Sequence, residues 1–254
     1  MSQLTLTALP DFPLVEPGDD LADLISQSLG KLNITLQEGD TLVLAQKIVS
    51  KAEGRYCFLN DVKPGAQAVE LAKKVDKSPE LVELILSESN EVVRTRPGVI
   101  VVEHRLGYVH ANAGIDKSNI SSEPDNPRVL LLPEDSDKSA HTLRARLADL
   151  HGVEIPIIIN DSSGRAWRNG TVGITIGTAG FEPVEDLIGD DDLFGRPMEV
   201  TEVAVADELA AAASYVMGQA AEAAPVVHIR GAQLKPSTEG SRALIREKSK
   251  DMFR

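Results

Sequence analysis

The strongest apolar pattern lies in the middle of the chain, where isoleucine fills four of the five positions 155–159. Apolar residues that follow one another without alternation are typical of a strand buried on both faces of a sheet. A second apolar run, at residues 171–176, follows after eleven residues that are almost all polar. The pattern predicts two core strands joined by a polar loop, and loops on a rigid scaffold often carry binding or catalytic residues. A solvated hairpin turn is the alternative interpretation.

The rest of the chain mixes the periods that distinguish strands from helices. Ala140, Leu143, Leu147 and Leu150 are spaced by three and four residues, as on one face of a helix. Further strands are predicted at residues 4–9, 41–45, 92–95, 99–103, 108–111, 129–132, 199–205 and 226–229, and further helices after Asp19 or Asp20, at residues 65–75, 79–89 and 207–217, and at the charged C-terminus. Because the order shows no regular βαβ rhythm, we expect a mixed α/β (α+β) fold in a single unit of residues 1–254, with two subdomains as the alternative.

Composition narrows the class of protein. The 254 residues carry a net charge of −13, with 39 acidic against 26 basic residues, which argues against a broad nucleic-acid-binding surface. Cys57 is the only cysteine, so no internal disulfide can form. The first ten residues lack the pattern of a signal peptide, and no apolar stretch approaches the ~20 residues of a membrane span. We expect a cytoplasmic protein that binds neither nucleic acid nor membrane.

The common nucleotide-binding and hydrolase motifs are absent from the sequence. There is no Gly-x-x-x-x-Gly-Lys-Ser/Thr, no Gly-x-Gly-x-x-Gly after a strand, no Gly-x-Ser-x-Gly and no His-Glu-x-x-His. The five histidines show no zinc spacing with Cys57. Oxygen ligands remain as the candidates for metal binding, and these select magnesium or manganese.

Two aspartates stand where predicted strands end. Asp161 and Ser162 follow the isoleucine run, and Asp116 follows the predicted strand at 108–111. If folding brings the two carboxylates together, they repel unless a cation joins them, and Asn119 is then placed to hydrogen-bond a ligand. Taken alone, Asp116 is more often a turn former, and Asn119 is more often bonded to its own backbone.

Several other polar residues allow two interpretations. Lys51, in the string Ser-Lys-Ala-Glu-Gly-Arg, is either a partner for phosphate or a solvated lysine. Arg165 and Arg168 can bind an anion together with the glycines around them. The triplet 190–192 of three aspartates is better interpreted as a solvated loop than as a metal site, and Gln219 alone indicates nothing.

Four stretches together resemble one family, the coenzyme F420-0:gamma-glutamyl ligases. They are Phe-Pro-Leu-Val at 12–15, Lys-Ile-Val-Ser-Lys-Ala-Glu-Gly-Arg at 47–55, Asn-Ala-Gly-Ile-Asp-Lys-Ser-Asn at 112–119, and Asp-Ser-Ser-Gly-Arg at 161–165 with Arg168 and Gly170. Asp-Leu-Phe-Gly-Arg at 192–196 supports the match. Because the order and spacing of these stretches also resemble the family's, the resemblance covers essentially the whole chain.

The resemblance implies an activity. Members of the family use GTP to join the amine of L-glutamate to a carboxylate on a phosphodiester-linked deazaflavin, coenzyme F420-0. A carboxylate is a poor acyl donor, so we expect an acyl phosphate as the intermediate, which makes the protein a carbon–nitrogen ligase of coenzyme F420 biosynthesis. The alternatives are the same chemistry on another acid acceptor, a metal-dependent phosphohydrolase, and a non-catalytic, metal-dependent nucleotide-binding protein.

The resemblance also implies site residues. We expect the GTP site at Phe12, Pro13, Leu14, Val15, Gln46, Lys47, Lys51, Asn119, Met217, Gly218 and Gln219, and two divalent cations, Mn2+ or Mg2+, with Asp116 and Asp161 at one and Ser162 and Gln219 at the other. The catalytic set is Asp116, Asp161, Lys51 and Arg165.

Further expectations concern the assembly and the departures from the family pattern. The resemblance implies the family's own α/β fold in an intertwined homodimer, admits K+ as a further ion, and implies no fused C-terminal flavin-binding domain. Ser162 stands where relatives often have threonine, which keeps the hydroxyl. Ala220 and Ala221 stand where relatives often have glycine, which argues against close phosphate contact there.

Overall fold

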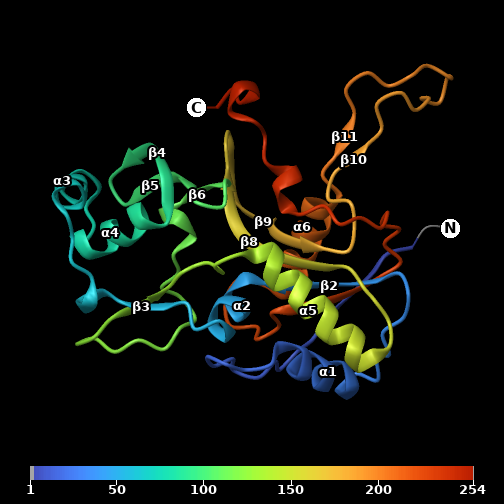
Figure 1. Ribbon diagram of the computed structural model, residues 1–254, viewed down its shortest axis with the longest axis horizontal. Helices are drawn as coiled ribbons and strands as arrows, with labels where there is room; N and C mark the ends of the chain where they lie inside the picture. The colour runs from blue at the N-terminus through green and yellow to red at the C-terminus, as the bar shows by residue number, and fades with distance from the viewer. Residues whose placement is uncertain (1–2, 254) are drawn as a thin grey trace.

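The computed structural model describes residues 3–253 and is built on a central sheet of five strands (Figure 1). The strand order is β1-β12-β2-β8-β9, in which β2 and β8 run parallel and the other neighbours run antiparallel. The bounds are Thr5–Ala8 for β1, Val226–Arg230 for β12, Asp40–Ala45 for β2, Ile157–Arg165 for β8 and Arg168–Ala179 for β9. The predicted mixed α/β class is confirmed.

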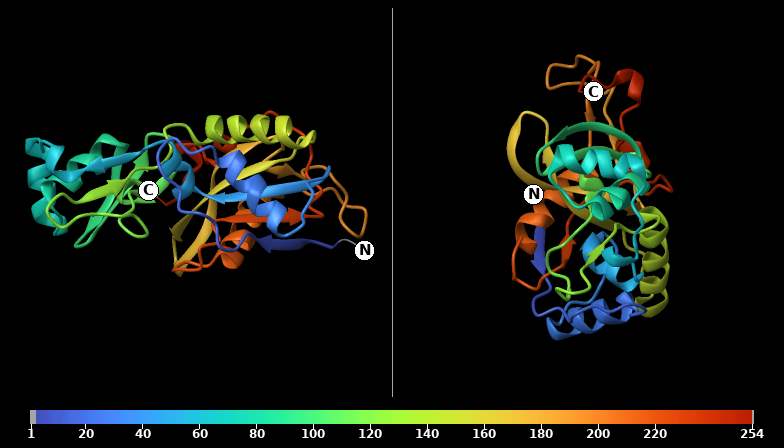
Figure 2. Two further views of the ribbon diagram at one scale, coloured as in Figure 1. Left: turned by 90° about the horizontal axis from the view of Figure 1, so that it is seen from below. Right: turned by 90° about the vertical axis from the view of Figure 1, so that its left-hand side faces the viewer.

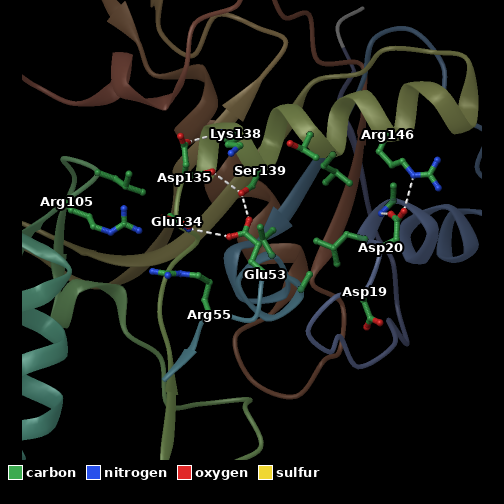
Figure 3. A pocket seen from close by; sticks show the side chains of 17 residues that line it. Asp19, Asp20, Glu53, Arg55, Arg105, Glu134, Asp135, Lys138, Ser139 and Arg146 are labelled. Atoms are coloured by element: carbon green, nitrogen blue, oxygen red, sulfur yellow. Dashed lines mark hydrogen bonds and ion pairs between the residues drawn. The ribbon is translucent and has the colours of Figure 1, made fainter. Parts of the chain in front are cut away.

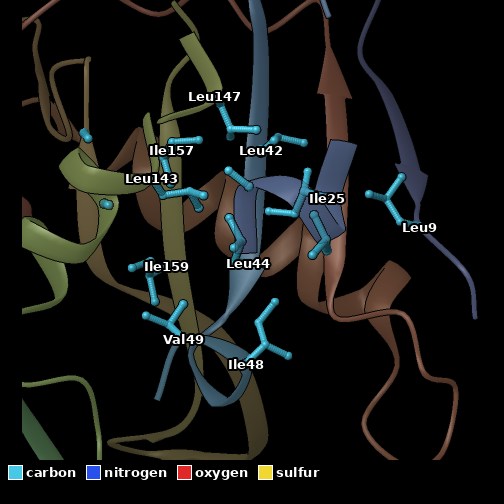
Figure 4. Close-up of a cluster of buried hydrophobic side chains, with 14 of the residues drawn as sticks. Leu9, Ile25, Leu42, Leu44, Ile48, Val49, Leu143, Leu147, Ile157 and Ile159 are labelled. Atoms are coloured by element: carbon cyan, nitrogen blue, oxygen red, sulfur yellow. The ribbon is translucent and has the colours of Figure 1, made fainter. Parts of the chain in front are cut away.

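A hydrophobic core lies on each face of this sheet. Under α1 (Leu21–Lys31) and α5 (Ser136–His151), the core contains Leu42 and Ile157 (Figure 4). Under α6 (Val205–Met217), the core contains the neighbouring residue Ile158. Because successive side chains of a strand point to opposite faces, the unbroken isoleucine run serves both cores, as its pattern predicts.

Two glycines of β9 set how closely helices approach the sheet. A Cβ atom on Gly173 would lie 2.5 Å from the carbonyl oxygen of Ala210 in α6, and one on Gly177 would lie 2.5 Å from that of Ser136 in α5. A side chain at either position would therefore force a helix away from the sheet.

Side-chain caps explain where three helices begin. Asp20 accepts from the amides of Ala22 and Asp23 at the start of α1, and Asp135 accepts from that of Lys138 in α5. Ser78 accepts from the amide of Leu81 in α4 (Pro79–Ser87). These caps satisfy backbone donors that have no partner inside the helix. The helix starts predicted after Asp19 or Asp20 and at residue 79 are confirmed.

A smaller lobe with its own core lies at one end of the molecule (Figure 2). It contains a three-stranded antiparallel sheet, β4 (Ser89–Arg96), β5 (Val99–His104) and β6 (Val109–Ala111), with α3 (Ala66–Val75) and α4. The two-stranded sheet of β3 (Tyr56–Phe58) and β7 (Arg128–Leu130) carries the chain into and out of this lobe.

At the other end, the short strands β10 (Glu185–Asp186) and β11 (Glu202–Val203) form the base of an extended arm (Figure 1). The strand predicted at 199–205 is thus reduced to two residues, and Val205 already belongs to α6.

The predicted eleven-residue loop at 160–170 is wrong. β8 continues to Arg165, β9 begins at Arg168, and only Ala166 and Trp167 lie between them. The pairing of β8 with β2 ends at Asn160, so beyond that point β8 has only β9 as a neighbour. Polar side chains are tolerated in this part of the hairpin because, in the part of the chain that the structure describes, no further strand pairs with its free edge.

The predicted C-terminal helix is also wrong. After β12, the described residues form only short 3-10 turns at Ser241–Leu244 and Lys248–Lys250. The segment has charged residues at short intervals and no apolar stripe, so a helix there would have no face to pack. In the described part of the chain, no helix is both long and apolar enough to cross a membrane.

A buried ionic cluster joins β2 to β12. Asp40 is fully buried and accepts from Nε and a terminal nitrogen of Arg230 at 2.8 and 2.7 Å, and its Oδ2 lies 2.9 Å from Nε2 of His228. Burial alone would raise the pKa of Asp40, but the hydrogen bonds from Arg230 and His228 outweigh burial and hold the pKa below its ordinary value of 3.8.

We predict that Asp40→Asn lowers the free energy of unfolding by about 2–3 kcal/mol at pH 7, because it breaks a buried, hydrogen-bonded ion cluster. A depressed pKa stabilises the fold above the unfolded-state pKa, so the difference should shrink as the pH falls below 3.8. Urea unfolding of both proteins at pH 7 and pH 3 measures this, with the exposed Asp125→Asn as control. An equal deficit at both pH values would mean that the charge contributes nothing.

Candidate functional site

The candidate site begins where β2 passes directly into α2 (Gln46–Ala52). Gln46, the first residue of this helix, is 2% exposed, and its Nε2 donates to Oδ2 of Asp116 at 2.7 Å. Its Oε1 accepts from the hydroxyl of Ser50, one turn further on, at 2.9 Å. Since the amide oxygen is occupied by Ser50, the amide nitrogen is turned toward the carboxylate.

Asp116 is fixed by its backbone. Its N–H donates to the carbonyl of Leu130 at 2.9 Å, and its carbonyl accepts from the N–H of Leu130 at 3.0 Å, which makes an isolated bridge to β7. The turn before it contains Asn112 and Ala113, both with a φ of 53°. Asp116 is therefore held by a strand pair and not by a flexible loop.

Asp161 lies on β8 one residue past the end of the β2 pairing. The register of β8 against β9 shifts between Ile159 and Asn160, and such a bulge changes the direction in which the following side chains point. Oδ2 of Asp161 lies 3.5 Å from Nε2 of His110, which is buried in β6. Burial lowers the pKa of His110 to about 4, so the imidazole is neutral at pH 7.

Two carboxylates thus share one partly buried space. Burial raises the pKa of Asp161 to about 6, although the amide of Ser162, the charge of Lys47 and Gln46 oppose the shift. Burial also raises the pKa of Asp116, and the negative charge of Asp161 adds to this effect. Both groups therefore resist ionisation where they stand.

Two lysines on one face of α2 lie beside this pair. Nζ of Lys47 is 3.4 Å from Oδ2 of Asp116 and donates to the carbonyl and hydroxyl of Ser118 at 3.1 and 3.2 Å. Lys51 follows four residues later, one helical turn along. Burial and the charge of Lys47 lower the pKa of Lys51. A bound anion would relieve the repulsion between the two ammonium groups.

The segment after α6 completes the site. The hydroxyl of Ser162 donates to Oε1 of Gln219 at 2.7 Å, and Nε2 of Gln219 donates to the hydroxyl of Ser214 at 2.9 Å. Nδ2 of Asn119 donates to the carbonyl of Ala220 at 3.0 Å. Residues from α2, the turn before β7, β8 and the end of α6 therefore meet in space although they are far apart in the sequence.

Other predicted residues lie outside this network of contacts. Arg165, four residues beyond Asp161 on an extended strand, is about 13 Å farther along, and one of its terminal nitrogens donates to the carbonyl of Asn169 at 3.5 Å. Phe12 and Val15 point into the core and Leu14 is exposed, while the N–H of Phe12 donates to the carbonyl of Ala223, close to Gln219 in the chain. Pro13 is exposed.

The residues present fit a hard divalent cation. The carboxylates of Asp116 and Asp161, the hydroxyl of Ser162 and the amide oxygen of Gln219 are all oxygen donors, which Mg2+ and Mn2+ prefer. Within residues 3–253, no group of three or more His, Cys, Asp or Glu side chains is arranged to hold a metal ion. Such a sparse set suits Mg2+, which usually keeps waters and substrate phosphates among its ligands.

Sequence reasoning missed two features of the site. Ser214 was not considered, although a serine among the alanines of a buried helix is a polar group that needs a partner. From the sequence, His110 is either a general base or, more often for a histidine on a strand, a structural residue, and nothing in the sequence indicates its contact with Asp161.

Comparison with known proteins gives one consistent answer. Residues 11–231 match the family model described as F420-0:Gamma-glutamyl ligase. The chain is 45% identical over 254 residues to the coenzyme F420:L-glutamate ligase of Methanothermobacter thermautotrophicus, covering 99% of both proteins. The proteins of the same name from Methanopyrus kandleri and Archaeoglobus fulgidus are 46% and 40% identical, and the matches cover 94% and 95% of this chain and 93% of each relative.

We predict that Asp161→Asn stabilises the metal-free protein at pH 8. A folded-state pKa of about 6 against an ordinary value of 3.8 means that the ionised form opposes folding, by about 3 kcal/mol. The stabilisation should be full above pH 6 and vanish below pH 4, where the carboxyl is protonated in both states. Thermal unfolding in the presence of a chelator measures this, with Asp125→Asn as control; a pH-independent difference would contradict the assignment.

Proposed function

The chain belongs to the F420-0:gamma-glutamyl ligase family, and we propose that it joins L-glutamate to coenzyme F420-0 in a cytoplasmic reaction driven by GTP. The protein is a ligase that forms a carbon–nitrogen bond. The observation that carries the GTP-dependent mechanism is the pair Asp116 and Asp161, set against Gln46 and flanked by Lys47 and Lys51. That arrangement has the charges that bind a metal–nucleotide complex.

The reaction proceeds in two steps. An oxygen of the acceptor carboxylate attacks the γ-phosphorus of GTP, the bond to the β-phosphate oxygen breaks, and GDP leaves with an acyl phosphate formed. The amine of L-glutamate then attacks the acyl carbon, inorganic phosphate leaves, and the nitrogen loses a proton as the amide forms. Neither step needs a protein nucleophile. The protein therefore acts by positioning the reactants and by stabilising charge.

Each group of site residues has a part in this scheme. Asp116 and Asp161 would hold one divalent cation, and Ser162 and Gln219 would hold the second, with K+ as a further ion. When bound, the divalent cations neutralise charge on the phosphate oxygens. Lys47 and Lys51 supply fixed positive charge on the same side, and Arg165 supplies a further donor from the hairpin.

The nucleotide itself lies, in this proposal, between two segments that the structure holds together. One comprises Phe12, Pro13, Leu14 and Val15, and the other follows α6 at Met217, Gly218 and Gln219. The side-chain amide of Asn119 donates to the carbonyl of Ala220, and the preceding residue, Ser118, accepts from Lys47. Asn119 therefore lies between the second segment and Lys47.

We predict that the purified protein releases phosphate from GTP only when both L-glutamate and coenzyme F420-0 are present, and that the acceptor gains the mass of glutamyl units. Asp161→Asn should reduce turnover by roughly three orders of magnitude or more, because it removes a metal ligand and a charge from the reacting centre. Phosphate release and mass spectrometry of the acceptor measure both, and Asp125→Asn is the control.

Each rival function has its own outcome in this experiment. Phosphate release without amine indicates a phosphohydrolase, and GTP binding without turnover indicates a nucleotide-binding protein. Glutamate addition to other acids but not to F420-0 indicates the same chemistry on another acceptor. Wild-type turnover in Asp161→Asn would remove that residue from the centre.

We further propose that two copies of the chain assemble through the arm at residues 183–203. Leu193 is fully exposed, and Phe194 and Val200 are 81% and 84% exposed, on a segment that leaves the body of the molecule (Figure 1). Large apolar side chains gathered on a projecting hairpin are typical of an interface. A second copy is the occupant that fits the family's intertwined homodimer.

We predict that light scattering after size exclusion gives the mass of a dimer for the wild type. Changing Leu193 and Phe194 to glutamate should shift the protein to monomer, because two charges would be buried against the partner. The control replaces the exposed Tyr215 of α6 with glutamate. A monomeric wild type, or a dimer that survives the double change, would contradict the proposal.

A further inference from the structure

A cavity of about 1020 Å3 lies at the end of α2 away from the two aspartates (Figure 3). It is bounded by α1, the end of α2 and α5, together with Arg55, which directly precedes β3, and Arg105, which lies in the turn between β5 and β6. Leu21, Val49 and Leu143 give it an apolar floor. Volumes of this size hold organic ligands rather than single ions.

One end of the cavity is cationic. Figure 3 shows Arg55 and Arg105 together on one side and the ion pair of Asp20 with Arg146 on the other. A single carboxylate oxygen of Glu88 accepts from a terminal nitrogen of Arg55 at 3.2 Å and from Nε of Arg105 at 3.1 Å. Two guanidinium groups against one carboxylate leave a surplus of positive charge. Burial would raise the pKa of Glu88, but His104 and the arginines lower it to about 2, so this carboxylate stays ionised.

The basic groups of the cavity have donors to spare. Nε of Arg105 is bonded, but neither of its terminal nitrogens has a partner in the described part of the chain, and the ammonium of Lys138 has none there either. These groups can therefore bind a ligand without breaking a contact within the protein.

The acidic groups of the cavity are mostly engaged. Asp20 and Asp135 cap α1 and α5, and Asp19 accepts from the amide of Glu16. Glu53 accepts from the hydroxyl of Ser139 and the amide of Glu134. Among the five lining acids, only the Glu134 side chain has no hydrogen bond to another residue within 3–253. The cavity thus offers unoccupied donors and few unoccupied acceptors, which favours an anion.

The cavity is joined to the aspartate pair by two rigid routes. One is α2, whose seven residues span about 10 Å from Gln46 to Ala52. The other is a row of buried rings: His110, 3.5 Å from Asp161, meets Tyr108 edge-on, and Tyr108 stacks on His104, which lies 3.6 Å from Glu88. The cavity and the aspartate pair are therefore held at fixed positions relative to each other.

We propose that this cavity binds an acidic organic ligand, with a carboxylate or phosphate group held by Arg55, Arg105 and Lys138 and the rest of the molecule over the apolar floor. The inference rests on the proposed function, in which two reactants have this chemistry. These are the deazaflavin acceptor, which has acidic groups and an apolar ring, and free L-glutamate. The volume and the apolar floor favour the acceptor.

The test uses Arg105→Gln and Lys138→Gln in the full-length protein. Lys138 has no partner within the described chain, so its loss breaks no internal contact, and Glu88 keeps Arg55 when Arg105 is changed. Arg94→Gln, on the exposed face of β4, removes the same charge outside the cavity and is the control. Titrations with F420-0 and with L-glutamate, without GTP, are combined with KM values for all three reactants.

The expected result is an increase of about tenfold in Kd and KM for F420-0 in each variant, with KM for GTP and kcat unchanged, since each change removes one charge-assisted contact. An increase for L-glutamate alone supports the cavity and identifies the amino acid as its ligand. Unchanged values for both, or an equal rise for GTP, overturn the proposal. Because the titrations need no turnover, a wild type that binds but does not ligate refutes the ligase function and leaves the cavity to be decided by the variants.

Discussion

The site depends on one electrostatic constraint: two carboxylates, Asp116 and Asp161, occupy a space from which water is largely withdrawn. Burial disfavours the charge on each, and the charge of Asp161 further disfavours the charge of Asp116, so ionising both costs free energy that a nearby cation offsets. Lys47 supplies one positive charge at 3.4 Å from Asp116, which leaves the pair one charge short of neutral. The residual negative charge favours a divalent cation over a further side chain, because a metal brings its own water and phosphate ligands. The arrangement is costly in the empty protein and is useful only when something positive is bound.

The surrounding fold can be understood as the means of holding this pair in place. Asp161 reaches the site because β8 continues beyond β2, and Asp116 reaches it because a strand pair with Leu130 fixes its backbone. The direct passage from β2 into α2 places Gln46 between the two, and Gly173 in β9 lets α6 approach until Gln219 meets Ser162. Each of these features lies on a regular element or a paired backbone rather than on a free loop. Rigid placement of this kind limits the reorganisation that a charged reaction centre would otherwise require.

Much of the fold can be predicted from local sequence patterns, but the arrangement of the site residues in space cannot. The isoleucine run at 155–159, the spacing of Ala140, Leu143 and Leu147, and the caps at Asp20 and Ser78 predict elements that the structure contains, because each signal acts within a few residues. The polar residues at 160–170 predict a loop, but they belong to the β8–β9 hairpin. Two strands that pair only with each other need no alternation of apolar and polar side chains, so the sequence pattern does not indicate them. The predicted C-terminal helix does not form, because helix propensity alone does not stabilise a helix that has no apolar face to pack. Asp116 and Asp161 are 45 positions apart in the sequence, so local periodicity cannot predict that they lie together. Only the family resemblance indicates it.

An acidic protein that handles acidic reactants faces a further problem, since a net charge of −13 repels them at long range. At physiological ionic strength the surface field decays over about 8 Å, so attraction must come from groups within direct reach. The chain concentrates basic groups at two places around α2: Lys47 and Lys51 on the face of the helix beside the aspartates, and Arg55 just past its end with Arg105 and Lys138. Lys47, Arg55 and Arg105 are partly withdrawn from solvent, where a charge is screened less and acts more strongly on a bound ligand. The short helix α2 joins these two positive regions within one rigid element. Glu88 and the row of rings from His104 to His110 connect the second region to the aspartates through packed side chains, so the positions of the two regions are fixed by the fold.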